Sequence, residues 1–304
     1  MAKGDEPSGG DGRWDDVLQA HIPHSARVWN YLLGGKDHFA ADRAAADHAV
    51  ALKPDMIEQA RADRAFLGRA VRHLVGEEGV RQFLDIGTGL PTADNTHQVA
   101  QRVAPECRIV YVDHDPLVLV HARALLTSSP EGGCDYIDAD VREPDEILAA
   151  ARARLDFTKP IAVMLVGILH HVEDAEKPEV IVRRLMSAVP PGSWLVINHP
   201  TSVVHGERSV RSARQWNESG GRPTVTLRTP EQIGRYFDGL ELLDPVWCRA
   251  RAGAPIPGPS SRRSTPTAGQ GGSRCSRPSE RPGRRDGRLP VRSPARLQAA
   301  RSAE

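Results

Sequence analysis

The sequence has few cysteines, no long apolar segment and almost no net charge. Its 304 residues include four cysteines, which are scattered and form no CxxC pair. This spacing suggests neither a disulfide framework nor a cysteine-based zinc site, and it favours a reducing compartment. No apolar run reaches the roughly 18 residues that a membrane-spanning helix needs. Basic residues outnumber acidic ones by 40 to 39, so the overall charge favours neither nucleic acid nor a membrane as a partner.

Both ends of the chain lack the apolar residues that a folded core requires. Residues 1–20 are rich in Gly and Asp and lack the basic start and apolar centre of a secretion signal. We therefore predict a disordered N-terminus and a cytoplasmic location. Residues 248–304 are dominated by Arg, Pro, Gly, Ser and Ala, with neither helical nor strand periodicity. They predict a disordered tail, with an Arg-rich arm that binds a polyanion as the alternative.

Strand and helix patterns alternate from residue 81 onward. The predicted strands are short, apolar and largely β-branched, and they span residues 82–86, 108–112, 134–138, 161–167 and 193–198. The helical patterns between them span residues 93–103, 116–126, 145–155 and 177–189, and a last helix and strand follow at 229–237 and 240–246. This alternation predicts an α/β fold: a Rossmann-like, doubly wound core over residues 81–247 with a mainly parallel sheet.

Residues 21–80 predict a helical N-terminal extension in front of this core. Apolar residues recur at helical spacing from Ser25 to the glycine pair Gly34-Gly35, then over 41–52 and again over 55–75. A glycine pair is a common helix end, because glycine readily adopts the left-handed conformation found there.

A glycine turn follows the first predicted strand. Residues 83–91 read Phe-Leu-Asp-Ile-Gly-Thr-Gly-Leu-Pro, so that Asp85 is followed by Gly87 and Gly89. A strand, a glycine turn and a helix hold a nucleotide-like ligand at the carboxyl edge of a parallel sheet. The third glycine of the dinucleotide motif is replaced by Thr92, which weakens the case for NAD. Asp85 and Asp94 flank the turn, where they repel a diphosphate but suit the sulfonium and ammonium of S-adenosylmethionine.

Acidic residues also follow the second and third predicted strands. Asp113 is placed to accept hydrogen bonds from the hydroxyls of a ribose. The alternative is that Asp113 and Asp115 only cap the next helix, a role that suits Asp115. Asp140 is placed to accept a hydrogen bond from the exocyclic amine of an adenine, with a solvated loop acid as the alternative.

Histidines follow the fourth and fifth predicted strands, at the edge where the ligand is expected. His171 and His199 are candidate proton acceptors for an oxygen nucleophile, because the pKa of histidine lies near neutral pH. The alternative is that both are packing, capping or turn residues. His21 and His24 have no accompanying carboxylate pattern, so no metal site is predicted.

Four stretches together resemble the successive motifs of class I S-adenosylmethionine-dependent methyltransferases: residues 83–91, 111–116, 138–141 and 166–171. More narrowly, residues 24–43, which contain the run NYLLGGKDHFAADR, are similar to a bacterial family of S-adenosyl methyltransferases with no assigned substrate. The resemblance covers about residues 22–246. It implies a final antiparallel strand, for which no pattern is found after residue 246.

The resemblance also implies positions for the cofactor. The implied residues are Asp85, Gly87 and Gly89 at the methionine end, Asp113 at the ribose, Asp140 and Val141 at the adenine, and Gly167 where the acceptor meets the methyl group. We interpret the N-terminal run as a segment that folds over the cofactor, with Tyr31, Gly34 and Asp37 as further binding residues. The alternative is an ordinary pair of helices that only packs against the core.

The sequence thus predicts an S-adenosylmethionine-dependent methyltransferase that acts on a small-molecule acceptor. Two alternatives remain: a non-catalytic or regulatory protein that keeps the cofactor pocket, and an NAD-dependent oxidoreductase, which the missing third glycine disfavours. Acceptor pockets follow no common sequence code, so the sequence predicts no particular acceptor. It predicts no oligomeric state either.

Overall fold

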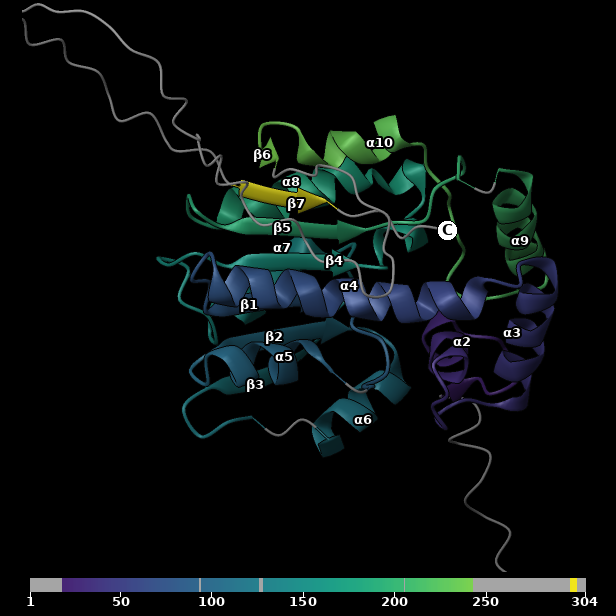
Figure 1. The fold of residues 1–304 in the computed structure, drawn as a ribbon, viewed down its shortest axis with the longest axis horizontal. Helices are drawn as coiled ribbons and strands as arrows, with labels where there is room; N and C mark the ends of the chain where they lie inside the picture. Colours follow the sequence, from purple (N-terminus) through teal and green to yellow (C-terminus); the bar gives the residue numbers. More distant parts are fainter. Residues whose placement is uncertain (1–17, 93, 126–127, 205, 243–295, 300–304) are drawn as a thin grey trace, which may run out of the picture.

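The computed structural model describes residues 18–92, 94–125, 128–204, 206–242 and 296–299. Its centre is a seven-stranded sheet in the order β3-β2-β1-β4-β5-β7-β6 (Figure 1). The five strands that carry the site pair in parallel: β1 (Gln82–Ile86), β2 (Arg108–Asp113), β3 (Gly133–Asp138), β4 (Ala162–Val166) and β5 (Trp194–Asn198). The strand order reverses between β1 and β4. Such a switch point opens a crevice at the carboxyl edge of a parallel sheet.

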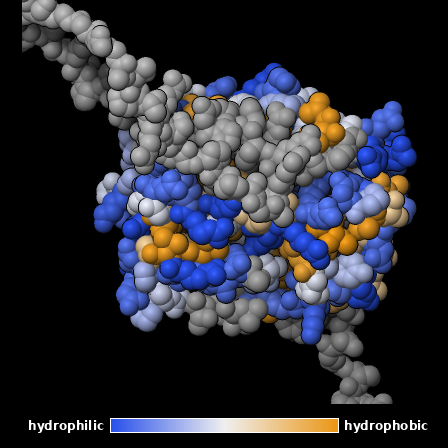
Figure 2. Space-filling view, in the orientation of Figure 1, coloured by the Kyte–Doolittle hydropathy of each residue, from blue (hydrophilic) through white to orange (hydrophobic). Residues whose placement is uncertain are grey.

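The described surface in Figure 2 is mainly hydrophilic, with limited hydrophobic areas. The exposed large apolar side chains each lie on a different element or loop: Val103, Val120, Val180, Val203, Val210 and Leu242. None of the helices in the described ranges combines the length and apolar character needed to cross a bilayer.

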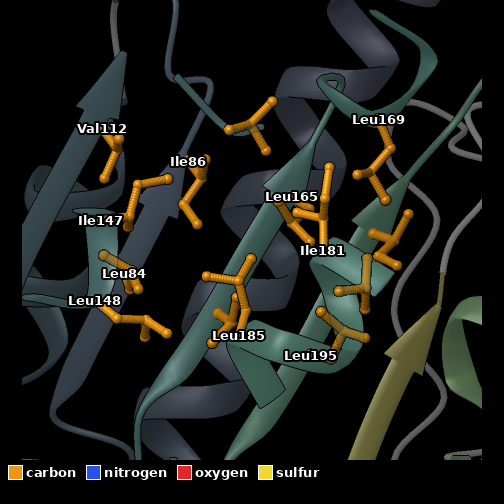
Figure 3. Packing of buried hydrophobic residues seen from close by; sticks show 14 of the residues in the cluster. Leu84, Ile86, Val112, Ile147, Leu148, Leu165, Leu169, Ile181, Leu185 and Leu195 are labelled. Carbon is orange, nitrogen blue, oxygen red and sulfur yellow. The ribbon is translucent and has the colours of Figure 1, made fainter. Parts of the chain in front are cut away.

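Helices cover both faces of the sheet, as expected for strands that are apolar on both sides. One face carries α4 (Met56–Gly76) and α5 (Thr96–Val103). The other carries α7 (Pro144–Ala151), α8 (Pro178–Ala188) and the short helix η3 (Arg235–Phe237). Figure 3 shows the Leu, Ile and Val side chains that fill this second face. The remaining helices of the core are α6 (Pro116–Leu125), η1 (Leu169–His171), η2 (Asp174–Glu176) and α10 (Pro230–Gly234).

Three helices form a separate layer beyond the carboxyl ends of the strands (Figure 1). They are α2 (Ser25–Leu32), α3 (Ala40–Leu52) and α9 (Glu207–Glu218). Val28, Leu32 and Ala46 are buried in a cluster distinct from the two cores of the sheet, and Trp216 of α9 packs against it. The layer therefore faces the edge of the sheet where ligands bind in folds of this kind.

One buried ion pair holds α2 and α3 together. Arg27 Nε lies 3.1 Å from Asp42 Oδ2, and both side chains are almost completely buried. The Asp42 carboxylate also accepts the backbone N–H groups of His24 (2.9 Å) and Phe39 (2.8 Å). A single carboxylate thus fixes the start of both helices.

Most predicted elements are present, with shifted boundaries. The helix predicted at 93–103 begins at Thr96, because the preceding Asn95 forms a capping box with Gln98. The helix predicted at 229–237 forms as α10 and η3, and Thr229 Oγ1 accepts the backbone N–H of Gln232 (3.3 Å). Helix α9 was not predicted. Ser209 is the one residue of α9 that is fully buried, so the sequence there shows no apolar stripe.

The far edge of the sheet is formed by β6 (Glu241–Leu242) and β7 (Arg296–Ala299). The strand predicted at 240–246 begins as β6, and its remainder lies outside the described residues. Within the segment predicted as a disordered tail, residues 296–299 form β7, which pairs in parallel with both β5 and β6. The rest of that tail and residues 1–17 lie outside the described residues. Among the described strands every pairing is parallel, so the antiparallel strand implied by the resemblance is not found there.

Candidate active site

A large cavity lies between the carboxyl ends of the strands and the layer of α2, α3 and α9. Its volume is about 1220 Å³, which exceeds the roughly 300–1,000 Å³ typical of a small-molecule site. Its walls come from the turns after β1, β2, β3, β4 and β5, from all three helices of the layer and from the first half of α4. A cavity of this size has room for two small ligands side by side.

The three predicted strand-tip acids meet at this cavity. Asp85 lies in β1, Asp113 ends β2 and Asp140 follows β3, and all three line the wall. The other predicted residues that line it are Gly87, Gly89, Val141, Gly167 and His171. The acids therefore lie at one edge of the sheet, around a single space.

The turn after β1 depends on glycine at two positions. Gly87 and Gly89 have φ angles of +76° and +63°, which disfavour any residue with a side chain. A Cβ atom on Gly87 would also lie 2.5 Å from the side chain of Ile168, which follows β4. Ile168 fills the space that Gly87 leaves, so the turns after β1 and β4 pack directly on each other.

Asp85 is buried beneath the glycine turn. Its Oδ2 accepts a hydrogen bond from Thr96 Oγ1 (2.6 Å) at the start of α5. Burial raises the pKa of Asp85 to about 6, while the Thr96 hydrogen bond and the positive charge of Arg64 oppose the rise. Arg64, on α4, lines the same cavity. Charges of both signs therefore lie next to the turn.

Asp113 links the turns that follow β1 and β2. Its Oδ2 accepts the backbone N–H of Gly89 (2.7 Å), and its Oδ1 accepts those of His114 (2.8 Å) and Asp115 (3.1 Å). Burial raises the pKa of Asp113, and these hydrogen bonds oppose the rise. A carboxylate offers about four acceptor positions, so the three bonds fix its orientation and leave capacity for a ligand hydroxyl.

Asp115 and Asp140 are each held by protein partners. Asp115 Oδ1 accepts the backbone N–H of Leu117 (2.7 Å), which caps α6, and its Oδ2 lies 2.8 Å from His24 Nδ1. Asp140 Oδ1 accepts the backbone N–H of Arg142 (2.9 Å) and lies 3.1 Å from the Arg142 guanidinium. Asp115 thus has a capping role and ties the N-terminal layer to the core, whereas Asp140 is held at the cavity wall.

The predicted binding residues Tyr31, Gly34 and Asp37 are not among the described residues that line the cavity, and their contact with the cofactor stays a prediction. Tyr31 donates its hydroxyl to Asp47 in an exposed position (3.0 Å). Asp37 lies 3.6 Å from a histidine of α6, and Gly34 follows the end of α2 with φ +80°. Helical geometry explains the difference, because Asn30 of α2 faces the cavity and the next residue points elsewhere. These three residues shape the loop and the outer side of the layer.

The histidines after β4 and β5 have different environments. His170 and His171 line the cavity, whereas His199 is completely buried and does not. His171 Nδ1 lies 2.9 Å from the carbonyl oxygen of Thr224, and burial lowers the pKa of His171 to about 4. His199 Nε2 lies 3.0 Å from an Arg228 nitrogen, and its Nδ1 lies 2.7 Å from the carbonyl oxygen of the next residue. Burial lowers the pKa of His199 to about 3, so its ring is neutral at neutral pH. Both ring nitrogens have protein partners.

The cavity wall also contains a polar pair that the sequence did not predict, Asn198 and Asp63. Asn198, at the end of β5, donates its side-chain N–H to Asp63 Oδ1 of α4 (2.9 Å). Burial raises the pKa of Asp63 to about 7, and the Asn198 hydrogen bond and the charge of Lys53 oppose the rise. Lys53 Nζ donates to Gln59 Oε1 (2.5 Å), and all four residues line the cavity. Asn198 ends strand β5, so it was predictable as a polar residue at the carboxyl end of a parallel strand. Asp63 lies within helix α4, where no sequence pattern marks a residue that lines the cavity.

The residues of this edge fit S-adenosylmethionine. Buried carboxylates at Asp85 and Asp113 suit a cationic ligand with ribose hydroxyls, and Arg64 suits the carboxylate of an amino acid. The described part of the chain contains no group of three or more His, Cys, Asp or Glu side chains placed to hold a metal ion. Fold and site together define an α/β protein of the class I methyltransferase type.

Comparison with known proteins gives the family. A family model described as S-adenosyl methyltransferase matches residues 12–263, so the chain belongs to this family and is an S-adenosylmethionine-dependent methyltransferase. The predicted family, fold class and cofactor are thereby confirmed.

The solved structures that resemble this chain include two with more than 40% sequence identity to it. One is a DUF574 family protein from Streptomyces avermitilis MA-4680, with 41% identity, a TM-score of 0.75, and coverage of 79% of this chain and 91% of that one. The other is a protein from Thermobifida fusca YX proposed as a methyltransferase, with 43% identity, a TM-score of 0.69, and coverage of 75% and 84%. Among proteins of curated function, none matches this chain.

Proposed function

We propose that this methyltransferase binds S-adenosylmethionine along the tips of β1, β2 and β3 and methylates a small-molecule acceptor. The observation that carries the proposal is the convergence of Asp85, Asp113 and Asp140 on one cavity. Asp113 accepts a hydrogen bond from the ribose through its remaining acceptor position. Asp140 accepts one from the adenine amine, and Val141 packs against the ring.

The methionine end of the cofactor lies at the glycine turn in this proposal. Gly87 and Gly89 allow the backbone to approach the ligand closely. Asp85 faces the ammonium and Arg64 faces the carboxylate, so that protein charges of opposite sign match a zwitterionic group. Gly167 forms the wall after β4, where the acceptor approaches.

The covered position of the cavity supports a small acceptor. Helices α2, α3 and α9 lie over the strand ends, and the walls that they and the start of α4 supply include Trp29, Met56 and Trp216. A polymer would need an extended groove at the surface, whereas an apolar compound of modest size fits a covered space.

When bound, the cofactor supplies an activated methyl group on a sulfonium. The contribution of the chain is to align the acceptor with that group and to exclude water. In this proposal, His170 and His171 contact the acceptor from the β4 side. His199 acts as a positioning residue, because its hydrogen bond helps hold the buried Arg228.

Calorimetric titration of the full chain tests the cofactor assignment. S-adenosylhomocysteine is expected to bind and to raise the melting temperature, since a ligand at about 100 times its Kd stabilises the native state by about 2.7 kcal/mol. Binding of NAD without binding of S-adenosylhomocysteine would overturn the assignment. Binding of S-adenosylhomocysteine with no methyl transfer to a panel of phenols, alcohols, amines and thiols would instead indicate a non-catalytic binding protein.

We also propose a cytoplasmic location. Both cysteines within the described ranges, Cys107 and Cys134, are free thiols, which suits a reducing compartment. Fractionation of cells that produce the protein tests this proposal, and recovery from a secreted fraction would contradict it.

A further inference from the structure

The polar group formed by Asp63 and Asn198 is not used by the donor assignment. Asn198 pairs in register with Val166, the last residue of β4, and its carbonyl oxygen accepts the backbone N–H of Gly167 (3.2 Å). Neighbouring strands lie about 4.8 Å apart. The Asp63–Asn198 pair therefore lies beside the turn after β4, next to the region assigned to the methyl group.

The Asp63 carboxylate has one oxygen held by the protein and one available to a ligand. Oδ1 accepts the hydrogen bond from Asn198, and within the described residues the Asp63 side chain makes no other hydrogen bond. The side chain keeps partial exposure although it lies in the interior, because it borders the cavity. Burial raises the pKa of Asp63 to about 7, so the group can exchange a proton at neutral pH.

The surroundings of Asp63 favour a hydroxyl over an amine. The positive charge of Lys53 acts on Asp63 and lowers its pKa. A cation at this point opposes the entry of an ammonium but stabilises negative charge that develops on an oxygen. The apolar wall that includes Trp29, Met56 and Trp216 suits an aromatic or otherwise apolar body for the molecule that carries the hydroxyl.

We propose that Asp63 is the proton acceptor for a hydroxyl group on an apolar or aromatic methyl acceptor, and that Asn198 positions the Asp63 carboxylate. This inference rests on the proposed function. In the step, a lone pair of the hydroxyl oxygen forms the bond to the methyl carbon. The bond between that carbon and sulfur breaks, and its electron pair stays on sulfur. The hydroxyl proton passes to the available oxygen of Asp63, which later releases it to water.

The first test replaces the carboxylate by an amide. Asp63→Asn is expected to leave the affinity for S-adenosylhomocysteine unchanged and to reduce transfer of labelled methyl groups to a panel of phenols and alcohols on the order of 100-fold or more. Asp47→Asn is the matched control, because Asp47 lies on α3 and outside the cavity wall. This control is expected to behave as the unsubstituted chain in both measurements.

The second test moves the pKa without removing the base. The Asn198 hydrogen bond lowers the pKa of Asp63, so Asn198→Ala is expected to shift the acidic limb of the pH–rate profile to higher pH. A residue that served only the fold would change the rate but not the position of this limb. The relevant partners are Lys53 from the α3–α4 connection and Asn198 from β5.

The failures of the two proposals are distinguishable. If the unsubstituted chain does not bind S-adenosylhomocysteine, the proposed function is wrong. If it binds and methylates only amines or thiols, or if Asp63→Asn methylates hydroxyls as fast as the unsubstituted chain, the role of Asp63 is wrong while the proposed function stands. An unmoved acidic limb in Asn198→Ala also overturns that role.

Discussion

Among single residues, Asp113 is the one on which donor binding is expected to depend most. Its carboxylate is buried and tied to three backbone N–H groups, so it is in place before a ligand arrives. Asp113→Ala is expected to weaken S-adenosylhomocysteine binding by about 1–2 kcal/mol, the range for leaving polar partners unsatisfied. This corresponds to a Kd increase of about 5- to 30-fold, measured by calorimetry.

Asp138→Ala is the control for this substitution. Asp138 ends the neighbouring strand β3, but its side chain is 57% exposed and does not line the cavity. Equal affinities of the two variants would contradict the ribose assignment of Asp113.

A residue-level prediction for stability follows from Asp63. Burial raises the pKa of Asp63 to about 7 in the folded chain from an ordinary value of 3.8, so the folded state binds this proton more tightly than the unfolded state. The contribution of Asp63 to stability is therefore fully present below about pH 4 and is lost as the pH rises to about 7. Asp63→Asn removes this dependence, so the variant should gain stability relative to the unsubstituted chain across that window, by roughly 1 kcal/mol per pH unit.

Urea unfolding at about pH 4.5 and about pH 7.5 measures this difference. If the free energies of unfolding of the two chains run parallel with pH, Asp63 is not buried as described.

At the scale of elements, the ion pair between Arg27 and Asp42 joins α2 to α3. Asp42→Ala leaves the Arg27 guanidinium buried without its counter-charge, and we expect it to cost about 3–5 kcal/mol in the free energy of unfolding of this layer. The control is Asp145→Ala, which breaks an exposed pair with Arg184 and should cost about 0–1 kcal/mol. Chemical denaturation followed by tryptophan fluorescence compares the two. Equal small losses would show that the buried pair does not hold the layer.

The central strands β1, β4 and β5 were predictable because each is a short apolar run that is buried along almost its whole length, and β1 has its predicted limits. The pattern of apolar residues does not predict an element that buries few side chains, or one that is held by hydrogen bonds to strands distant in the sequence. Helix α9 buries Ser209 alone, and the four residues of β7 are held by backbone bonds to β5 and β6. Neither arrangement leaves a period in the sequence.

Some residues of the candidate site were predictable from the sequence and others were not. Asp85 and Asp113 were predictable because the carboxyl ends of parallel strands meet at one edge. The orientation of Tyr31, which donates to Asp47 in an exposed position, was not predictable, since a run of conspicuous residues does not show which face of a helix turns inward. Asp63 was missed because only tertiary packing brings the middle of α4 to the tip of β5.

Across the whole molecule, stability is expected to be uneven. The layer of α2, α3 and α9 has a small cluster in which Val28, Leu32 and Ala46 are buried together with Ala60 of α4, whereas the sheet is enclosed by two much larger cores. The layer should therefore open at a lower free energy than β1 or β4. Because α2 lines the cavity, S-adenosylhomocysteine should slow amide exchange there more than in the sheet.

Hydrogen exchange with and without the ligand measures both effects. Uniform exchange across the chain, or protection confined to the strands, would show that the layer does not cover the ligand.

In the proposed arrangement, the contact between Gly87 and Ile168 couples the donor site to the acceptor site. The turn after β1, to which we assign the methyl donor, and the turn after β4, to which we assign the acceptor, share one van der Waals surface, where the Ile168 side chain fills the space that Gly87 leaves. A change of acceptor preference introduced near Ile168 will consequently be transmitted to donor affinity. Selection for new substrates should accordingly retain this isoleucine and vary the walls contributed by α2 and α9.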